Sequence, residues 1–285
     1  MAVVALLILF CAAGPAQNLR GVVDLHAHSD PDSVPRSIDA VDLARLAQSR
    51  GMRALVLKNH YEPTASLAYI VRKQVPGIEV FGGIALNRTV GGINAAAVER
   101  MTLVKGGWGR VVWMPTFDAR NQALFSKDSR PSVPVSRDGA LLPAVLEVLD
   151  LISKHRLTLA TGHSSPAETL LLIHEARKRK IDRILVTHPM VAPVLMSVEQ
   201  MQEAARLGAK LEFVSNERKP AFYAKAIRAV GPENCIVSSD LGQASNPLHP
   251  DGLQAFLKGL AEAGFTAREL DLMSKENPAK LLGLR

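Results

Sequence analysis

Two histidines near the start of the chain have the spacing of a metal-ligand pair. His26 and His28 close an apolar run, residues 21–29, whose composition is typical of a β-strand. Side chains two residues apart on a strand point to the same face, so both imidazoles could bind one ion from the strand's end. A lone His-x-His also occurs by chance beside turns. The hypothesis of a metal site therefore depends on further ligands from elsewhere in the chain.

Further candidate ligands stand directly after later apolar segments. They are His163, His188 and Asp240, together with Lys58 and the neighbouring His60. Imidazoles and carboxylates around an ion, with one position left for water, form a catalytic metal site. A divalent ion lowers the pKa of its bound water from about 15.7 towards 7, which predicts a hydrolase. In this interpretation Asp240 both binds the ion and takes a proton from the water.

The elements that must position these residues alternate regularly. Eight short β-branched segments are separated by longer amphipathic ones, with strands expected at residues 21–25, 54–57, 79–84, 110–114, 157–160, 183–186, 210–214 and 235–239. Eight strand–helix units over about 250 residues predict a single-domain α/β fold, the (β/α)8 TIM barrel, whose active sites lie at the C-terminal ends of the strands. Every candidate ligand follows such an end. A doubly wound open sheet is the alternative, but no glycine-rich phosphate-binding turn follows the first strand.

Ser37 and Ser165 are expected to cap the helices that follow them, and Pro166 suits a first helical turn. A long segment, residues 115–139, interrupts the alternation, and we interpret it as a lid. Its cations could hold an anionic substrate group, although solvated loop charges explain them equally well. These cations are Arg120, Lys127, Arg130 and Arg137.

The amino-acid composition limits which class of protein the chain can belong to. The 285 residues are 47% hydrophobic and 21% charged, which fits one large globular domain. Residues 1–16 hold an apolar stretch too short to span a bilayer, followed by small residues, and are predicted to be a secretory signal peptide. We therefore expect a secreted or periplasmic barrel, residues 17–285, without membrane attachment. A mis-assigned start or a buried N-terminal strand is the alternative. Cys235 is the one cysteine after this leader, which leaves no disulfide.

The net charge of +7 permits an anionic small-molecule substrate or nucleic acid. The basic residues are scattered, however, and their one dense run, residues 177–180, ends a predicted helix, where the helix dipole favours cations. Nucleic acid is therefore not an expected partner. The oligomeric state stays open.

Several motifs together resemble the amidohydrolase superfamily of metal-dependent hydrolases. They are Asp24-Leu-His-Ala-His28, His163, His188, Ser239-Asp240 and the closing Glu276-Asn-Pro-Ala-Lys-Leu-Leu-Gly-Leu284. The resemblance implies one or two divalent ions, most often zinc, bound by the histidines and Asp240, with Asp240 moving the proton. We expect no added β-sandwich, which makes the chain most similar to phosphotriesterase-like, TatD-like and 2-pyrone-dicarboxylate-lactonase-like members.

The sequence departs from this superfamily after the fourth strand. Many two-metal members place a carboxylated lysine or a glutamate there, whereas residues 111–115 offer neither. Lys58 could replace this bridge if its amine takes up carbon dioxide; equally, it could hold a substrate carboxylate or neutralise Asp240. His60 resembles a metal ligand of the polymerase-and-histidinol-phosphatase (PHP) family. That second resemblance fails at Asp240-Leu-Gly242, where an Asp-x-His is expected.

Three functions remain open at this point. The first is hydrolysis of an amide, lactone or ester bond, the second is a phosphoesterase or nuclease activity, and the third is a barrel that binds metal or ligand without turnover. Two other residues are expected to have plainer roles. Glu212 should pack or form a salt bridge, and His249 should lie in a turn.

Overall fold

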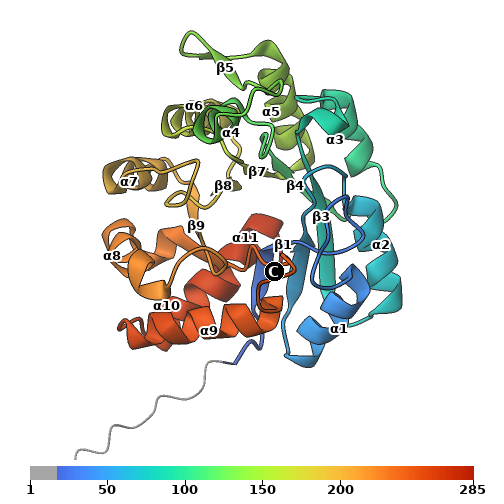
Figure 1. Cartoon of the computed structure of the whole chain (residues 1–285), viewed down its shortest axis with the longest axis vertical. Coiled ribbons are helices and arrows are strands. Elements are labelled where there is room, and N and C mark those ends of the chain that lie inside the picture. The colour runs from blue at the N-terminus through green and yellow to red at the C-terminus, as the bar shows by residue number, and fades with distance from the viewer. Residues whose placement is uncertain (1–17) are drawn as a thin grey trace, which may run out of the picture.

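The structure is a computed structural model and describes residues 18–285. Its main sheet has eight parallel strands in the order β1-β2-β3-β4-β7-β8-β9-β10, surrounded by helices (Figure 1). Asp240 N donates to His26 O over 2.8 Å, and His28 N donates to Leu241 O over 2.9 Å, so the last strand meets the first. The predicted (β/α)8 barrel is confirmed. The predicted signal peptide, residues 1–16, lies outside the described residues.

The barrel strands are β1 (Val23–Ala27), β2 (Ala54–Leu57), β3 (Glu79–Ala85), β4 (Gly109–Trp113), β7 (Thr158–Ala160), β8 (Ile184–Val186), β9 (Lys210–Val214) and β10 (Cys235–Ser238). The helices around them are α1 (Ala40–Ser49), α2 (Ala65–Gln74), α3 (Ala95–Thr102), α5 (Pro143–His155), α6 (Pro166–Lys178), α7 (Val198–Arg206), α8 (Pro220–Val230) and α9 (His249–Glu262). The chain closes with α10 (Ala267–Asp271), a π-helical turn (Leu272–Glu276) and α11 (Asn277–Leu282). Across residues 18–285, the helices are too short or too polar for a membrane span.

Two apolar cores lie on the two sides of the sheet, because successive strand residues face opposite sides. In β2, Leu55 and Leu57 pack outward against the helices, while Ala54 and Val56 pack into the barrel. The interior core also includes residues of α11, which closes one end of the barrel. The side chain that follows Leu57 therefore points into the barrel at its other end, and that side chain is Lys58.

The helix caps differ from the expectation at one of two positions. Ser165 caps α6 as predicted, accepting a hydrogen bond from Glu168 N while the Glu168 carboxylate accepts one from Ser165 N. Ser37 does not cap α1. Asp39 is the cap, because its carboxylate accepts from two free N–H groups of the first turn, whereas the Ser37 N–H donates to Gly242 O.

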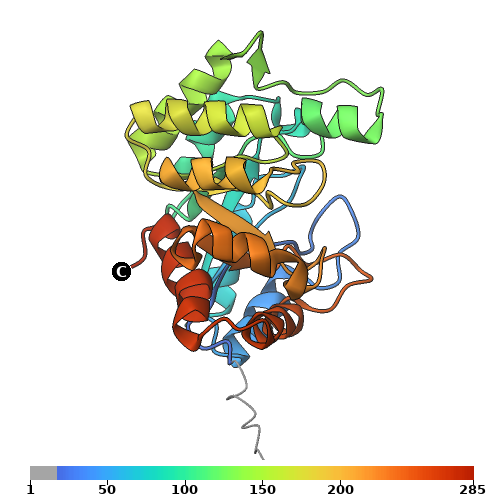
Figure 2. The same cartoon turned by 90° about the vertical axis from the view of Figure 1, so that its left-hand side faces the viewer.

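The predicted lid segment has secondary structure of its own. It contains α4 (Arg120–Ser126), and its last residues begin a short hairpin of β5 (Ser136–Arg137) and β6 (Ala140–Leu141). Figure 2 shows α4 beside the loop that follows β8, on the side where the barrel strands end, and Asn121 of α4 donates to Pro193 O in that loop. This segment is therefore placed at the mouth where the candidate ligands were expected.

Candidate active site

Five of the eight histidines form a closed ring at the C-terminal mouth of the barrel. Going round, the ring centroids are separated by 5.2 Å (His26–His28), 4.8 Å (His28–His60), 6.5 Å (His60–His163), 5.0 Å (His163–His188) and 6.1 Å (His188–His26). All five side chains are buried. The structure thus brings together the five histidines that the sequence analysis selected from the ends of four different strands.

An irregularity in β1 directs the first pair into this ring. The pairing of β1 with β2 shifts register between Asp24 and Ala27, so three steps along β1 match two along β2. Leu25 packs in the interior core and Ala27 in the outer core, which leaves His26 and His28 together on the inner side. Bulges of this kind often redirect side chains beside active sites.

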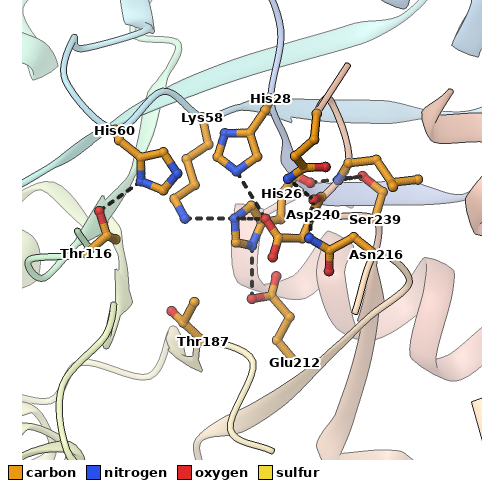
Figure 3. A network of polar contacts seen from close by, with 12 residues as sticks. His26, His28, Lys58, His60, Thr116, Thr187, Glu212, Asn216, Ser239 and Asp240 are labelled. Carbon is orange, nitrogen blue, oxygen red and sulfur yellow. Dashed lines mark hydrogen bonds and ion pairs between the residues drawn. The ribbon is translucent and has the colours of Figure 1, made fainter. Parts of the chain in front are cut away.

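Asp240 meets both histidines at one point. Its Oδ1 lies 2.9 Å from His26 Nε2 and 3.0 Å from His28 Nε2 (Figure 3). One ligand atom from each of the three residues lies within 4.8 Å of the other two. Two imidazole nitrogens and a carboxylate oxygen are donors that suit a zinc-like divalent cation. The donor set and its spacing therefore fit the metal implied by the sequence.

The pKa shifts favour the ligand forms of these groups except His26, where burial would lower the pKa but Asp240 and Glu212 raise it. Burial lowers the pKa of His28 to about 3 and that of His188 to about 4, so both rings are neutral at pH 7. Burial also holds the pKa values of His60 and His163 well below their usual range. For Asp240, burial alone would raise the pKa, but His26 and His28 hold it well below its usual range. A neutral imidazole and an ionised carboxylate are the forms that bind metal.

Other buried carboxylates support the first histidine. Glu212 Oε2 lies 3.2 Å from His26 Nδ1, and both side chains are fully buried. Asp24 Oδ1 accepts hydrogen bonds from His26 N and Ser239 N, and burial raises the pKa of Asp24 to about 6. The ring and the backbone of His26 are thus held by two different acidic side chains.

Lys58 enters the centre of the site from β2. Its Nζ lies 2.7 Å from His26 Nε2 and 5.4 Å from the centroid of the Trp113 ring. Burial lowers the pKa of Lys58 to about 8, although Asp240 and Glu212 oppose the shift. Because an ammonium group can only donate, the contact with His26 is that of a donor meeting a ring nitrogen.

Two further histidines, His60 and His163, are held by residues of the segment after β4. His60 Nδ1 lies 2.9 Å from Thr116 Oγ1, and His163 Nδ1 donates to Gln122 Oε1 over 2.8 Å. The ring of Phe117, 41% exposed, lies 4.0 Å from the His60 ring and 5.7 Å from the His163 ring, centroid to centroid. The predicted lid therefore provides supporting contacts inside the site.

The backbone is strained at two ligand candidates. His188 and Asp240 have φ values of 24° and 51°, in the left-handed region that residues other than glycine seldom adopt. Next to Asp240, Gly242 has φ 125°, and a Cβ there would lie 2.3 Å from His28 O. The close approach of the last strand to the first thus requires glycine at this position.

Most, though not all, of the expectations for single residues agree with the structure. His26, His28, Lys58, His60, His163, His188 and Asp240 all lie at the mouth, and their roles stay predictions. Glu212 forms the predicted salt bridge, but inside the barrel. The expected turn at His249 is wrong: this residue begins α9 and is fully buried.

Three supporting residues were missed. Thr116 stands three residues after the end of β4, as His60 and His163 do after β2 and β7, so the strand-end rule that selected the histidines could have found it. Gln122 and Phe117 carry no such signal, since their contacts depend on how the segment after β4 folds back. The cations of the predicted lid lie on the surface. All four are exposed, namely Arg120, Lys127, Arg130 and Arg137, and Arg130 forms an ion pair with Asp128.

A barrel with a cluster of imidazoles and a carboxylate at its C-terminal mouth defines a class of candidate metalloproteins. Comparison with known proteins gives the family of the chain and the structures that share its fold. Residues 21–212 match the model of DUF6282, a family of unknown function, and the chain belongs to this family. No curated protein matches the sequence.

Solved structures share the fold over nearly the whole chain. An amidohydrolase from Pseudomonas aeruginosa has a TM-score of 0.64 at 13% identity, covering 93% of this chain and 97% of its own. A putative 2-pyrone-4,6-dicarboxylic acid hydrolase from Pseudomonas putida has a TM-score of 0.61 at 16% identity, with 92% and 97% covered. An amidohydrolase from Burkholderia multivorans with bound zinc has a TM-score of 0.61 at 13% identity, with 93% and 99% covered. These similarities show that the chain shares the barrel fold of these proteins; the PHP resemblance stays a prediction.

Proposed function

We propose that the protein is a metal-dependent hydrolase that cleaves an amide, lactone or ester bond in a small molecule. The observation that carries this proposal is the convergence of His26 Nε2, His28 Nε2 and Asp240 Oδ1 within 4.8 Å. Three buried atoms with lone pairs would repel one another at this spacing unless protons or a cation lay between them. The fold supports the same conclusion, because structures with this barrel include proteins named as amidohydrolases and as a dicarboxylic acid hydrolase.

His26, His28 and Asp240 would hold the divalent cation. When bound, the cation would activate a water molecule and polarise the bond to be cleaved. Zinc is the ion we propose, because it accepts nitrogen and oxygen ligands in a tetrahedral site with one open position. His163 and His188, with ring centroids 5.0 Å apart on the other side of the mouth, are the candidates for holding a second ion.

Asp240 is the proposed proton acceptor. Its carboxylate is ionised and, at 8% exposure, is the most exposed of the three proposed ligands, so a water at the mouth can reach it. It would take the proton of the attacking water and return it to the leaving group. Lys58 would neutralise the buried negative charge of Asp240 and Glu212. In this role Lys58 stays an ammonium group and is not a carboxylated bridge between two ions.

The substrate is proposed to be small and to carry an anionic group. Phe117 lies over His60 and His163 and narrows the mouth, while the exposed Arg120 and Lys127 lie on the segment beside it. An arginine can pair with a carboxylate in a two-point contact. We also propose that the protein is secreted or periplasmic; N-terminal sequencing of the exported chain would test this.

Metal analysis combined with activity assays tests the proposal. We expect purified wild-type protein to bind zinc and to hydrolyse at least one member of a panel of esters, lactones and amides. His26→Ala and His28→Ala should lose both the metal and the activity. His174→Ala is the matched control, because this histidine lies on the outside of α6 with a side chain that is 53% exposed.

Three other results would contradict the proposal. If His26→Ala and His28→Ala keep their zinc content and activity, the site is wrongly assigned. Zinc binding without turnover of esters, lactones, amides or phosphoesters would instead indicate a binding barrel. Turnover of phosphoesters alone would indicate the phosphoesterase alternative.

A further inference from the structure

Glu212 is a fully buried carboxylate on the inner face of the barrel. Its strand neighbours Leu211 and Phe213 pack in the outer core, which turns Glu212 towards the interior. A carboxylate buried without compensation is strongly destabilising, and an apolar residue of similar size would serve packing better. Packing alone therefore does not explain a glutamate at this position.

Its contact is with one particular atom of the site. Glu212 Oε2 lies 3.2 Å from His26 Nδ1 (Figure 3), and within residues 18–285 this ring nitrogen is the hydrogen-bond partner of the carboxylate. On the other side of the ring, Lys58 Nζ lies 2.7 Å from His26 Nε2, and because an ammonium group can only donate, Nε2 is the accepting nitrogen. A carboxylate can only accept, so the contact with Glu212 places the ring proton on His26 Nδ1.

The consequence appears on the opposite side of the ring. With the proton held on Nδ1, the Nε2 atom of His26 has a lone pair, which accepts from Lys58 Nζ in the metal-free protein and lies 2.9 Å from Asp240 Oδ1. A ring with the other tautomer would present an N–H group to the same point and could not bind a cation there. The hydrogen-bond partner of His26 Nδ1 therefore decides whether His26 Nε2 can bind a cation.

We propose that Glu212 is a positioning residue that fixes the tautomer and orientation of His26 for cation binding. This inference rests on the proposed function only in so far as a cation is held at His26; the contact with Nδ1 is a property of the metal-free protein. Carboxylate partners of metal-binding histidines generally act in this way, and replacing them weakens metal binding by about 10- to 100-fold.

Two replacements of Glu212 separate positioning from packing. Glu212→Gln keeps an oxygen that can accept from Nδ1–H, whereas Glu212→Leu keeps the volume and removes the acceptor. Thr158→Val is the control: Thr158 is also buried and donates to Leu281 O over 2.7 Å, but it lies at the opposite end of the barrel. It should lower stability without affecting the cation site.

The measurements are nitrogen NMR of the histidine rings in the metal-free proteins and zinc affinity by competition with a chelator. In wild-type protein and Glu212→Gln we expect a proton on His26 Nδ1 and similar zinc affinities. Glu212→Leu should mix the two tautomers and bind zinc about 10- to 100-fold more weakly. Thr158→Val should keep both the wild-type tautomer and the wild-type affinity.

Several results would overturn the inference. Wild-type protein with Nδ1 unprotonated would do so without any variant, as would a folded Glu212→Leu that binds zinc like the wild type. If Glu212→Leu does not fold, Glu212→Gln becomes the test. The inference is wrong if Glu212→Gln loses the proton on His26 Nδ1, or if it binds zinc about 10- to 100-fold more weakly than the wild type. Wild-type protein that binds no zinc contradicts the proposed function, while the NMR spectra still test the contact.

Discussion

The two ends of the barrel interior are built from opposite kinds of residue. At the closed end, Leu281 and Leu282 of α11 pack against strand residues such as Val23 and Ile236 in an apolar core. At the mouth, the same strands end in imidazoles, carboxylates and a lysine, all buried. One end therefore gains stability from the transfer of apolar surface out of water, while the other holds charged groups that need partners.

This difference shows where the molecule carries strain. The mouth holds two ligand candidates with positive φ, His188 and Asp240, and a carboxylate, Asp24, whose pKa is raised to about 6 by burial. Such features persist only where the surrounding structure enforces them, and they are common at functional sites. The contrast predicts that changes at the mouth affect activity and that changes at the closed end affect stability.

The largest expected effect is that of Asp240→Asn. Asparagine has the same shape and tolerates the φ of 51°, so the variant should fold. It cannot accept the proton that we assign to Asp240, so kcat/KM should fall by about 10³-fold, within the range for removal of a general base. This corresponds to about 4 kcal/mol of transition-state stabilisation. Steady-state kinetics would measure it, and a loss below tenfold would contradict the role of Asp240.

The complementary change at the closed end is Leu281→Ala. Leu281 is 4% exposed within the interior core, and removing its side chain should lower the free energy of unfolding by about 3 to 4 kcal/mol. Urea denaturation would measure this loss, while kcat/KM of the folded protein should stay at the wild-type value. Leu103→Ala is the control, because Leu103 is 63% exposed and its loss should change stability by about 0.5 kcal/mol or less. A large fall in kcat/KM for Leu281→Ala would show that the two ends are coupled.

Local rules allowed the fold and the ligand candidates to be predicted. The alternation of short β-branched segments with amphipathic ones gave the barrel, and the strand-end rule placed His163, His188 and Asp240 at one mouth. Strand ends were predictable because burial on both faces makes strand residues apolar, so the first polar residue marks the end.

What could not be predicted depended on contacts distant in sequence. Asp39 rather than Ser37 caps α1: the Ser37 N–H donates to Gly242 O after the last strand, so Ser37 is held outside the helix, which begins at Ala40 directly after Asp39. Likewise, the contact of Gln122 with His163 spans 41 residues and requires the fold of the segment after β4. His249 was assigned to a turn because two prolines flank the region, although proline is also well suited to the first turn of a helix.

The smallest of the three expected effects is the contribution of His249 to the pH dependence of the free energy of unfolding. The residue is fully buried at the start of α9, and burial lowers its pKa to about 4. In the unfolded chain its pKa is near 6.5, so below that pH the unfolded state binds more protons and stability falls as the pH falls. The loss begins near pH 6.5 and is complete near pH 4, and the shift corresponds to about 3 kcal/mol.

His249→Gln should remove this part of the pH dependence from the metal-free protein. His28 and His188 contribute in the same direction, and Asp24 in the opposite one, since its raised pKa makes the fold more stable as the pH falls through about 6. These groups remain in both proteins, so the difference between the two stability curves isolates His249. Urea denaturation between pH 7 and 4 would measure it, with the exposed His174→Gln as control. Parallel curves for His249→Gln and wild type would mean that His249 accepts a proton within the fold, which would contradict the lowering of its pKa by burial.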